Sequence, residues 1–169
     1  MKQFVTFGFL FVFCLASKVG DLFLVKGNTD CLKNVENLMV ELDCSTTTYL
    51  ENRSFSDYLK IAQRAHDWEV KSLDYFFEWF NDETKHLTAV PVNDKDQYKL
   101  VIVVRNLQKS GRISAEIKLI DTKTNTTEAV FTLKGSDGDK KDYITLRDPM
   151  KDAGETIGKY LKKNVERKK

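Results

Sequence analysis

Residues 97–121, QYKLVIVVRNLQKSGRISAEIKLID, contain two strand patterns in succession, and residues 127–135, TEAVFTLKG, contain a third. The first run, up to Leu107, is almost continuously apolar, which suits a central strand covered at least partly on both faces. The second run alternates, so Ile113, Ile117 and the residues in phase with them face inward. We therefore expect three consecutive strands, the last two forming a hairpin around the polar loop TKTNT.

Two shorter strand patterns precede this region. They are DLFLVKG at residues 21–27 and NLMVELDCS at residues 37–45, where Leu38, Val40 and Leu42 alternate with more polar positions. The segment between them, NTDCLKNVE, is rich in turn-forming residues. We expect these two strands to form a hairpin-like opening to the sheet.

A helical pattern begins at Ser54, because the apolar period changes there from two residues to three and four. Ser54 and Asp57 have the spacing of a capping box. The pattern allows one long helix or two helices with a break near residues 66–68. We expect an extended connection at residues 87–97, LTAVPVNDKDQ, because a proline restricts the residue before it. The expected buried stripe of the helical region consists of Leu59, Ala62, His66, Val70, Leu73, Phe77 and Phe80.

The sequence ends in a further helical pattern, in which Asp148 is the expected cap and Pro149 the first helical residue. Gly154 and Gly158 lie on its apolar stripe, where they would let the helix approach the sheet closely. The element order is therefore ββαβββα. We expect a single two-layer α+β domain over residues 17–169, with a five-stranded, mostly antiparallel or mixed sheet and two helices on one face.

Residues 1–16, MKQFVTFGFLFVFCLA, have the pattern of a secretory signal peptide. A single Lys2 precedes an apolar run from Phe4 to Ala16, which is shorter than the roughly 20 residues that a membrane-spanning helix needs. We expect cleavage after Ala16, a secreted or periplasmic protein, and no transmembrane span in the mature chain. An uncut membrane anchor and a lipid on Cys14 remain as alternatives.

Charge and composition give little indication of a nucleic-acid partner. The formal net charge is +2, and removal of the leader with its single lysine leaves +1. The main basic cluster is the carboxyl-terminal segment KYLKKNVERKK, where cations complement the end of a helix. No stripe of basic and aromatic residues is present, so we expect no binding to nucleic acid.

Two cysteines, Cys31 and Cys44, remain in the chain after removal of the leader. In an oxidising compartment an even pair suggests a disulfide, which would close a loop of about 14 residues and contribute about 3 kcal/mol. Two buried thiols are the alternative. The sequence does not decide whether the two β-carbons lie within reach of each other.

Residue groups typical of catalysis or cofactor binding are sparse. The eight glycines form no phosphate-binding loop. His66 and His86 have no Cys, Asp or Glu at a metal-ligand spacing. Residues 135–142, GSDGDKKD, hold several carboxylates but lack the glycine that a calcium loop requires at its turn. We expect a protein that is not an enzyme and that has no cofactor and no catalytic or metal-binding residues.

Several of these stretches resemble a family of small uncharacterised exported proteins of Bacteroidetes: DLFLVKGN, the strand region 98–135, and AGETIGKYLKK. More distantly, AEIKLIDTKTNTTEAVF is similar to a hairpin in envelope accessory domains, namely the amino-terminal domain of the periplasmic Tol protein, the curli secretion lipoprotein and the lipoprotein activators of cell-wall synthases. The chain has Asn125 and Thr126 where that hairpin usually has a glycine. The resemblance implies a shared architecture and a role in docking other proteins.

Residues 72–80, SLDYFFEWF, place five aromatic side chains in nine positions. Part of this cluster continues the expected buried stripe. Trp68, Tyr75 and Trp79 follow a second line, which is either covered as part of a broad buried face or exposed for recognition. We therefore take these three as the candidate partner-binding residues.

The function that these observations favour is an exported, non-enzymatic binding or accessory module of the bacterial cell envelope. It would contact an unknown envelope protein through the aromatic line or through an exposed sheet edge. One alternative is a carrier of a small apolar ligand, with a cavity lined by Trp68, Phe76 and Val103. Another is an unrecognised hydrolase, which would bring three or more polar side chains together in one cleft.

Overall fold

The computed structural model of the chain describes residues 18–19, 21–50, 53–62, 68–108, 112–136 and 147–165. The predicted leader lies outside these residues and stays a prediction. The strands are β1 (Lys18–Val19), β2 (Leu22–Gly27), β3 (Asn37–Asp43), β4 (Thr48–Tyr49), β5 (Arg53–Ser54), β6 (Thr88–Pro91), β7 (Tyr98–Leu107), β8 (Ile113–Asp121) and β9 (Thr126–Ser136). The helices are the short 3-10 helix η1 (Asp30–Leu32), α1 (Phe55–Ala62), α2 (Trp68–Glu83) and α3 (Arg147–Asn164).

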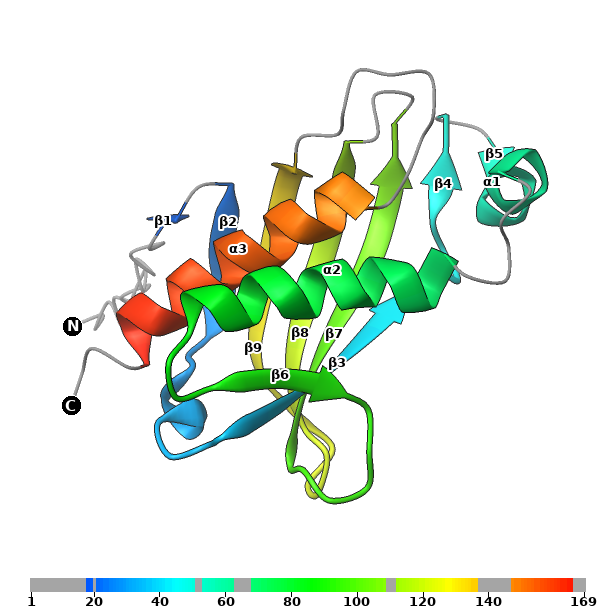
Figure 1. The fold of residues 1–169 in the computed structure, drawn as a ribbon. Coiled ribbons are helices and arrows are strands. Elements are labelled where there is room, and N and C mark those ends of the chain that lie inside the picture. The colour runs from blue at the N-terminus through cyan, green and yellow to red at the C-terminus, as the bar shows by residue number, and fades with distance from the viewer. Residues whose placement is uncertain are drawn as a thin grey trace, which may run out of the picture.

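The nine strands of the described residues form one mixed sheet (Figure 1). Seven of them follow the order β1-β2-β9-β8-β7-β3-β6, and β4 and β5 lie off this path, paired with each other. β7, β8 and β9 are antiparallel neighbours at its centre, as the sequence predicts. β3 runs parallel to β7 and to β6, and β4 pairs with the far end of β7. The α+β class and the mixed sheet are therefore confirmed. The five-strand count and the element order are wrong. The strands that the sequence did not reveal are short: β1, β4 and β5 have two residues each and β6 has four. Such segments are too short to show the alternation of apolar and polar residues that identifies a strand.

The predicted hairpin between the strands at 21–27 and 37–45 is also wrong. β2 pairs with β9 in one half of the sheet, whereas β3 lies between β7 and β6 in the other half. A hairpin requires a short loop that turns the chain back on itself. The link here contains η1 and buries Leu32, so it is packed against the core and carries the chain to the opposite half.

β6 lies where we expected only an extended connection. It forms an edge of the sheet and ends at Pro91, which agrees with the restriction of proline to edges and strand ends. Its outer side faces α2. Asn81 on that helix accepts a hydrogen bond from the Ala89 N–H at 2.7 Å and donates one to the Ala89 carbonyl at 3.3 Å. The Asn81 side-chain amide therefore bonds to the backbone N–H and C=O of Ala89, which an additional strand would need for pairing.

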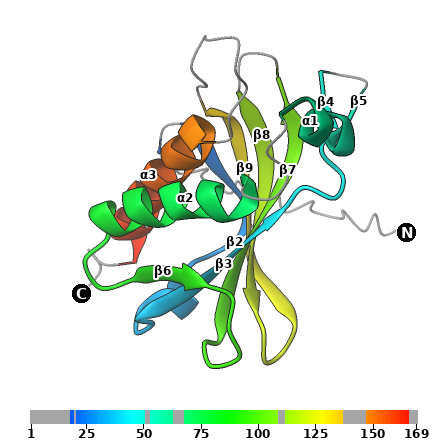
Figure 2. The same ribbon diagram turned by 45° about the vertical axis from the view of Figure 1, so that its right-hand side comes forward.

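α2 and α3 lie side by side against one face of the sheet (Figures 1 and 2), as we expected. The close contact of Gly154 and Gly158, however, is with α2 and not with the sheet. A Cβ atom at Gly154 would lie 2.5 Å from the Phe76 carbonyl oxygen, and one at Gly158 would lie 3.1 Å from that of Phe80. The two glycines therefore set the distance between the helices, which run in the same direction.

The buried face of α2 is rotated from the predicted stripe. Phe76 and Phe80 are both 0% exposed and their rings stack at 5.7 Å, whereas Leu73 and Phe77 are only half-buried. The side chain of Val70 lies outside the described residues. The backbone of Phe76 and Phe80 lies against Gly154 and Gly158, so the side of α2 that adjoins α3 also carries its buried side chains.

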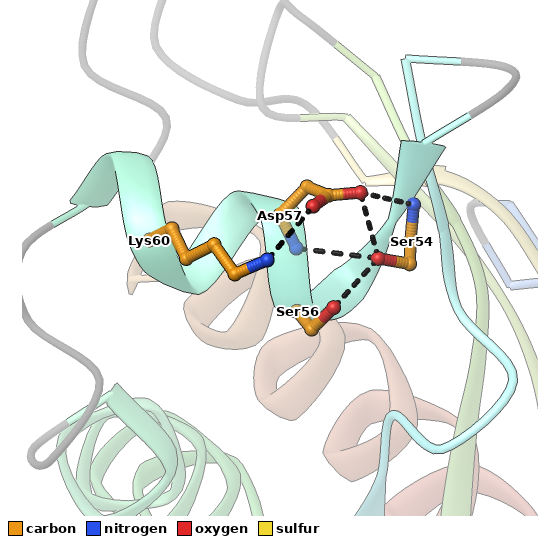
Figure 3. A network of polar contacts seen from close by, with 4 residues as sticks. All are labelled: Ser54, Ser56, Asp57 and Lys60. Carbon is orange, nitrogen blue, oxygen red and sulfur yellow. Dashed lines mark hydrogen bonds and ion pairs between the residues drawn. The ribbon is translucent and has the colours of Figure 1, made fainter.

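Of the two alternatives for the helical region, the structure has two helices: α1 ends at Ala62 and α2 begins at Trp68. The capping box is confirmed (Figure 3). The Asp57 carboxylate accepts from the Ser54 N–H at 3.2 Å, and the Ser54 hydroxyl accepts from the Asp57 N–H at 3.3 Å. Lys60 lies 3.4 Å from the same carboxylate. These bonds satisfy donors that the first turn of a helix otherwise leaves open.

Cys31 and Cys44 form no disulfide, which corrects the prediction. Cys31 lies near Asp121, whose charge acts on the thiol, and Asp121 pairs with Tyr98 at the start of β7. Cys44 directly follows Asp43, which pairs with Val103 further along β7. The two cysteines are therefore separated by most of the length of β7, about 20 Å at 3.3 Å per residue. A disulfide requires Cα atoms within about 7 Å.

Candidate functional site

Tyr75 and Trp79 lie one turn apart on the flank of α2 that adjoins α3, and both are half-buried. Trp68 begins the same helix, but its side chain lies outside the described residues. The structure therefore places two of the three candidate partner-binding residues on one flank. Neither is part of the fully buried face formed by Phe76 and Phe80. The helical spacing determines this placement, because residues four apart share a face.

Trp79 is joined to α3 by a contact that the sequence did not indicate. The Lys151 ammonium nitrogen lies 3.6 Å from the centre of the Trp79 ring, within the range of a cation–π interaction. One turn further along α2, Glu83 lies 3.9 Å from Lys159 and 3.6 Å from Lys162. Aromatic and charged side chains thus alternate along the line where the two helices meet.

We call this surface the α2–α3 ridge. It consists of Tyr75, Trp79 and Glu83 from α2, and Lys151, Lys159 and Lys162 from α3. Lys159 also contacts Glu155, and this hydrogen bond raises the pKa of the Lys159 ammonium above its ordinary value. The ridge offers a half-exposed indole, a group enriched at the centres of protein interfaces, and it is bordered by lysines, which are more typical of an interface rim.

The opposite face of the sheet carries paired charges instead of a helix. Lys99 contacts Glu41 at 2.7 Å, and Glu116 lies 3.1 Å from both Arg105 and Lys118. The hydrogen bond from Lys118 is the main cause that lowers the pKa of Glu116. Each carboxylate therefore has a neighbouring cation, and such exposed pairs are typical of a solvated face.

Asp121, at the end of β8, has a lowered pKa because it is part of a local turn. The Asp121 carboxylate accepts from the Gln97 amide at 2.8 Å and from the backbone N–H groups of Lys123 and Thr124. The bond from Gln97 is the main cause that lowers the pKa of Asp121. Asn125 follows with φ 55°, so an asparagine adopts the left-handed conformation for which the resembling hairpins use glycine. These contacts build the β8–β9 turn.

A metal or cofactor site is not evident in the part of the chain that the structure describes, where no group of three His, Cys, Asp or Glu residues could hold an ion. His66 and the carboxylates of residues 137–142 lie outside that part. His86 is exposed. No helix among the described residues is long and apolar enough to cross a membrane.

The structure contains an open hollow of about 280 Å³ that the sequence did not predict. It lies between the end of β3 and α1, and its lining is Glu41, Leu42, Asp43, Cys44, Ser45, Phe55 and Leu59. Of the three residues expected to line an apolar carrier's cavity, the side chain of Trp68 lies outside the described residues, and Phe76 and Val103 point to opposite faces of the sheet. Phe76 lies on the helix-covered side, whereas Val103 is out of phase with Ile102 and Val104, which pack in the main core.

Three polar side chains converge in this hollow, as a hydrolase would require, but their chemistry does not suit catalysis. Hydrogen bonds from Ser45 lower the pKa of Asp43, which makes this carboxylate a weaker base. Glu41 is held by Lys99 at 2.7 Å. None of the residues lining the hollow is a histidine that could activate Ser45.

Comparison with family models and with curated protein sequences finds no match for this chain. Among solved structures, the chain is similar to the PelC dodecamer from Paraburkholderia phytofirmans, with 8% identity, a TM-score of 0.46, and coverage of 85% of this chain and 95% of that one. It is also similar to the protein XCC0632 (DUF330) from Xanthomonas campestris, with 13% identity, a TM-score of 0.36, and coverage of 80% and 87%. These values are too low to transfer residues or activity.

Proposed function

We propose that this chain is an exported, non-enzymatic module of the bacterial cell envelope that binds another protein at the α2–α3 ridge. The half-exposed Trp79 is the observation that carries the proposal. Its ring is stacked by Lys151 at 3.6 Å and flanked by Tyr75, although the core of α2 is complete without it. A tryptophan held in a fixed orientation at a surface can bury a large area on a partner with little loss of conformational entropy.

The charges of the ridge support a protein partner with acidic groups. Lys151, Lys159 and Lys162 all project from α3, and Glu83 and Glu155 neutralise only part of their charge. A carboxylate on the partner could approach Lys151 while an apolar group covers the indole. Such complementarity sets orientation and association rate more than affinity.

The proposed export depends on the pattern of residues 1–16. The first described strand begins at Lys18, so cleavage after Ala16 would leave the described sheet intact. A location in the envelope and a docking role like that of the envelope accessory domains are parts of this proposal.

The test is affinity capture from an envelope extract of the native host with the wild-type chain and with Trp79→Ala. A specific partner should be retained by the wild type and lost from the variant. Val92→Ala is the matched control, since Val92 is an exposed apolar residue, 52% accessible, in the loop that follows β6. Equal capture by both variants would remove the ridge as the contact surface, provided that thermal unfolding shows both to be folded.

A further inference from the structure

β3 is longer than β6, the strand that pairs with the edge of β3 that faces away from β7. β6 pairs with Asn37–Val40, whereas β7 pairs with Met39–Asp43 on the other side. The edge of Glu41–Asp43 that faces away from β7 therefore has no strand partner among the described residues. The N–H of Thr88 in β6 donates to the Glu36 carbonyl at 2.7 Å. Because backbone groups alternate sides along a strand, those of Leu42 point toward the same open edge.

The end of β6 has a clear local cause. Pro91 is the last residue that pairs with β3, and its missing N–H lies on the outer side of β6, as the alternation from Thr88 and Ala89 requires. The chain then turns away at Asn93, whose side-chain oxygen accepts from the N–H groups of Lys95 at 2.9 Å and Asp96 at 3.0 Å. β6 itself is closed to additional strands by Asn81, which occupies both backbone groups of Ala89. The sheet thus leaves a short, defined length of β3 open on this side.

The hollow described above runs along this open edge. Five consecutive residues, Glu41 to Ser45, line it. Successive side chains of a strand point to opposite faces, so a hollow that touches all of them must lie beside the strand. β7 covers one side of β3 as far as Asp43, which leaves the other side. Phe55 and Leu59 of α1 form the facing wall, and Figure 1 shows α1 above and to the right of the end of β3.

The lining has the chemistry of a site for a cationic and apolar occupant. Glu41 and Asp43 contribute carboxylates, and the lining contains no lysine or arginine. Glu41 is already paired with Lys99. Asp43 accepts the Ser45 N–H at 2.8 Å and has no ion pair of its own among the described residues, although Arg105 and Lys118 are near enough to act on its charge. Leu42, Phe55 and Leu59 supply the apolar surface. The volume of about 280 Å³ falls below the 300–1,000 Å³ typical of small-molecule pockets and corresponds to about nine water molecules.

We propose that this hollow, together with the open edge of β3 beside it, is a slot that binds an extended peptide segment of a partner protein by strand addition to β3. The peptide backbone pairs with the N–H and C=O of Leu42. One of its side chains, a lysine or arginine, reaches Asp43, and an apolar side chain packs on Phe55 and Leu59. Main-chain pairing supplies affinity and the two side-chain positions supply selectivity, as in other strand-addition complexes. This site is separate from the α2–α3 ridge and extends the proposed function to a second surface.

The experiment is selection of a random dodecapeptide display library on the folded chain without residues 1–16, followed by affinity measurement with the synthetic peptides recovered. Selected peptides should share a basic residue and an apolar residue in an extended pattern. Asp43→Asn, which keeps an acceptor for the Ser45 N–H, should weaken their binding about tenfold. N-methylation of a central peptide amide should weaken it to a similar degree, and the amide of Leu42 should exchange more slowly with deuterium when peptide is bound.

Trp79→Ala is the control that separates the two surfaces, and peptide binding should be unchanged in it. Recovery of no peptide would overturn the proposal, as would peptides that bind wild type and Asp43→Asn equally or that tolerate N-methylation. Peptides lost from Trp79→Ala but retained by Asp43→Asn would place binding on the ridge, which would refute the slot while supporting the ridge as a contact surface.

Discussion

Replacing Gly154 by alanine should destabilise the protein, although alanine is the better helix former. In an exposed helix the change would contribute about 1 kcal/mol of stability. Here the new Cβ would lie 2.5 Å from the Phe76 carbonyl oxygen and 3.2 Å from the Phe80 nitrogen. Both are backbone atoms of α2 and cannot rotate away. The helices would have to separate by about 1 Å, which costs about 3 kcal/mol in a close-packed interior.

The expected net loss is therefore about 2 kcal/mol, equivalent to a decrease in Tm of about 4–8 °C for a chain of this size. Urea unfolding followed by circular dichroism measures it. Gly158→Ala should cost less, because its contacts are longer: a Cβ there would lie 2.9 Å from the Glu83 Cβ and 3.1 Å from the Phe80 carbonyl oxygen. Glu78→Gly, at an exposed position in the middle of α2, calibrates helix propensity at about 1 kcal/mol. A Gly154→Ala variant as stable as wild type, or more stable, would refute the close approach of α2 and α3.

Three further predictions concern the capping box, the β8–β9 turn and a thiol. Ser54→Ala should destabilise α1 by about 1 kcal/mol, measured by urea unfolding, because it removes the cap of the first turn. The folded-state pKa of Asp121 lies below its ordinary value, so its stabilising contribution is complete above about pH 5 and is lost as the pH falls through the folded pKa. In the Asp121→Asn variant, the urea concentration at half-unfolding should therefore fall less when the pH is lowered from about 5. A pH profile equal to that of the wild type would exclude the stabilising contribution of the Asp121 carboxylate. Burial is the main cause that raises the pKa of Cys31 to about 11, so iodoacetamide at pH 8 should alkylate it about two orders of magnitude more slowly than a cysteine in an unstructured peptide; an equal rate would contradict this environment.

The parts of the fold that the sequence predicted are those with a local cause. β7, β8 and β9 follow one another through short connections, and β8 shows a clean two-residue period. The cap at Ser54 and Asp57 is likewise a contact between residues three apart. Such features need no knowledge of distant segments, because the period and the turn residues act within a few positions.

The errors concern partners that are distant in sequence. The pattern of β2 and β3 indicates a strand but not a neighbour, and each pairs with strands far along the chain. The glycines of α3 signal a close approach, but the sequence does not say whether a sheet or a helix approaches. The disulfide was predicted because an even pair of cysteines remains in an exported chain, and that count carries no information on how far apart Cys31 and Cys44 lie in the fold.

The candidate site divides in the same way. The aromatic line on α2 was visible as a helical period, whereas Lys151, which holds Trp79, comes from a separate helix. The slot beside β3 arises from the difference between the lengths of β6 and β7. Pro91 was the available signal, since proline within a sheet is confined to edges and strand ends, but its meaning depends on β6 being a strand at all.

The most direct measurement is site-specific photo-crosslinking in the envelope of the native host. A benzophenone amino acid at position 79 of the full chain should give a discrete adduct with one protein, and the same residue at position 92 should not. Adducts of equal yield at both positions, or none at position 79, would contradict the binding of a partner protein at the α2–α3 ridge.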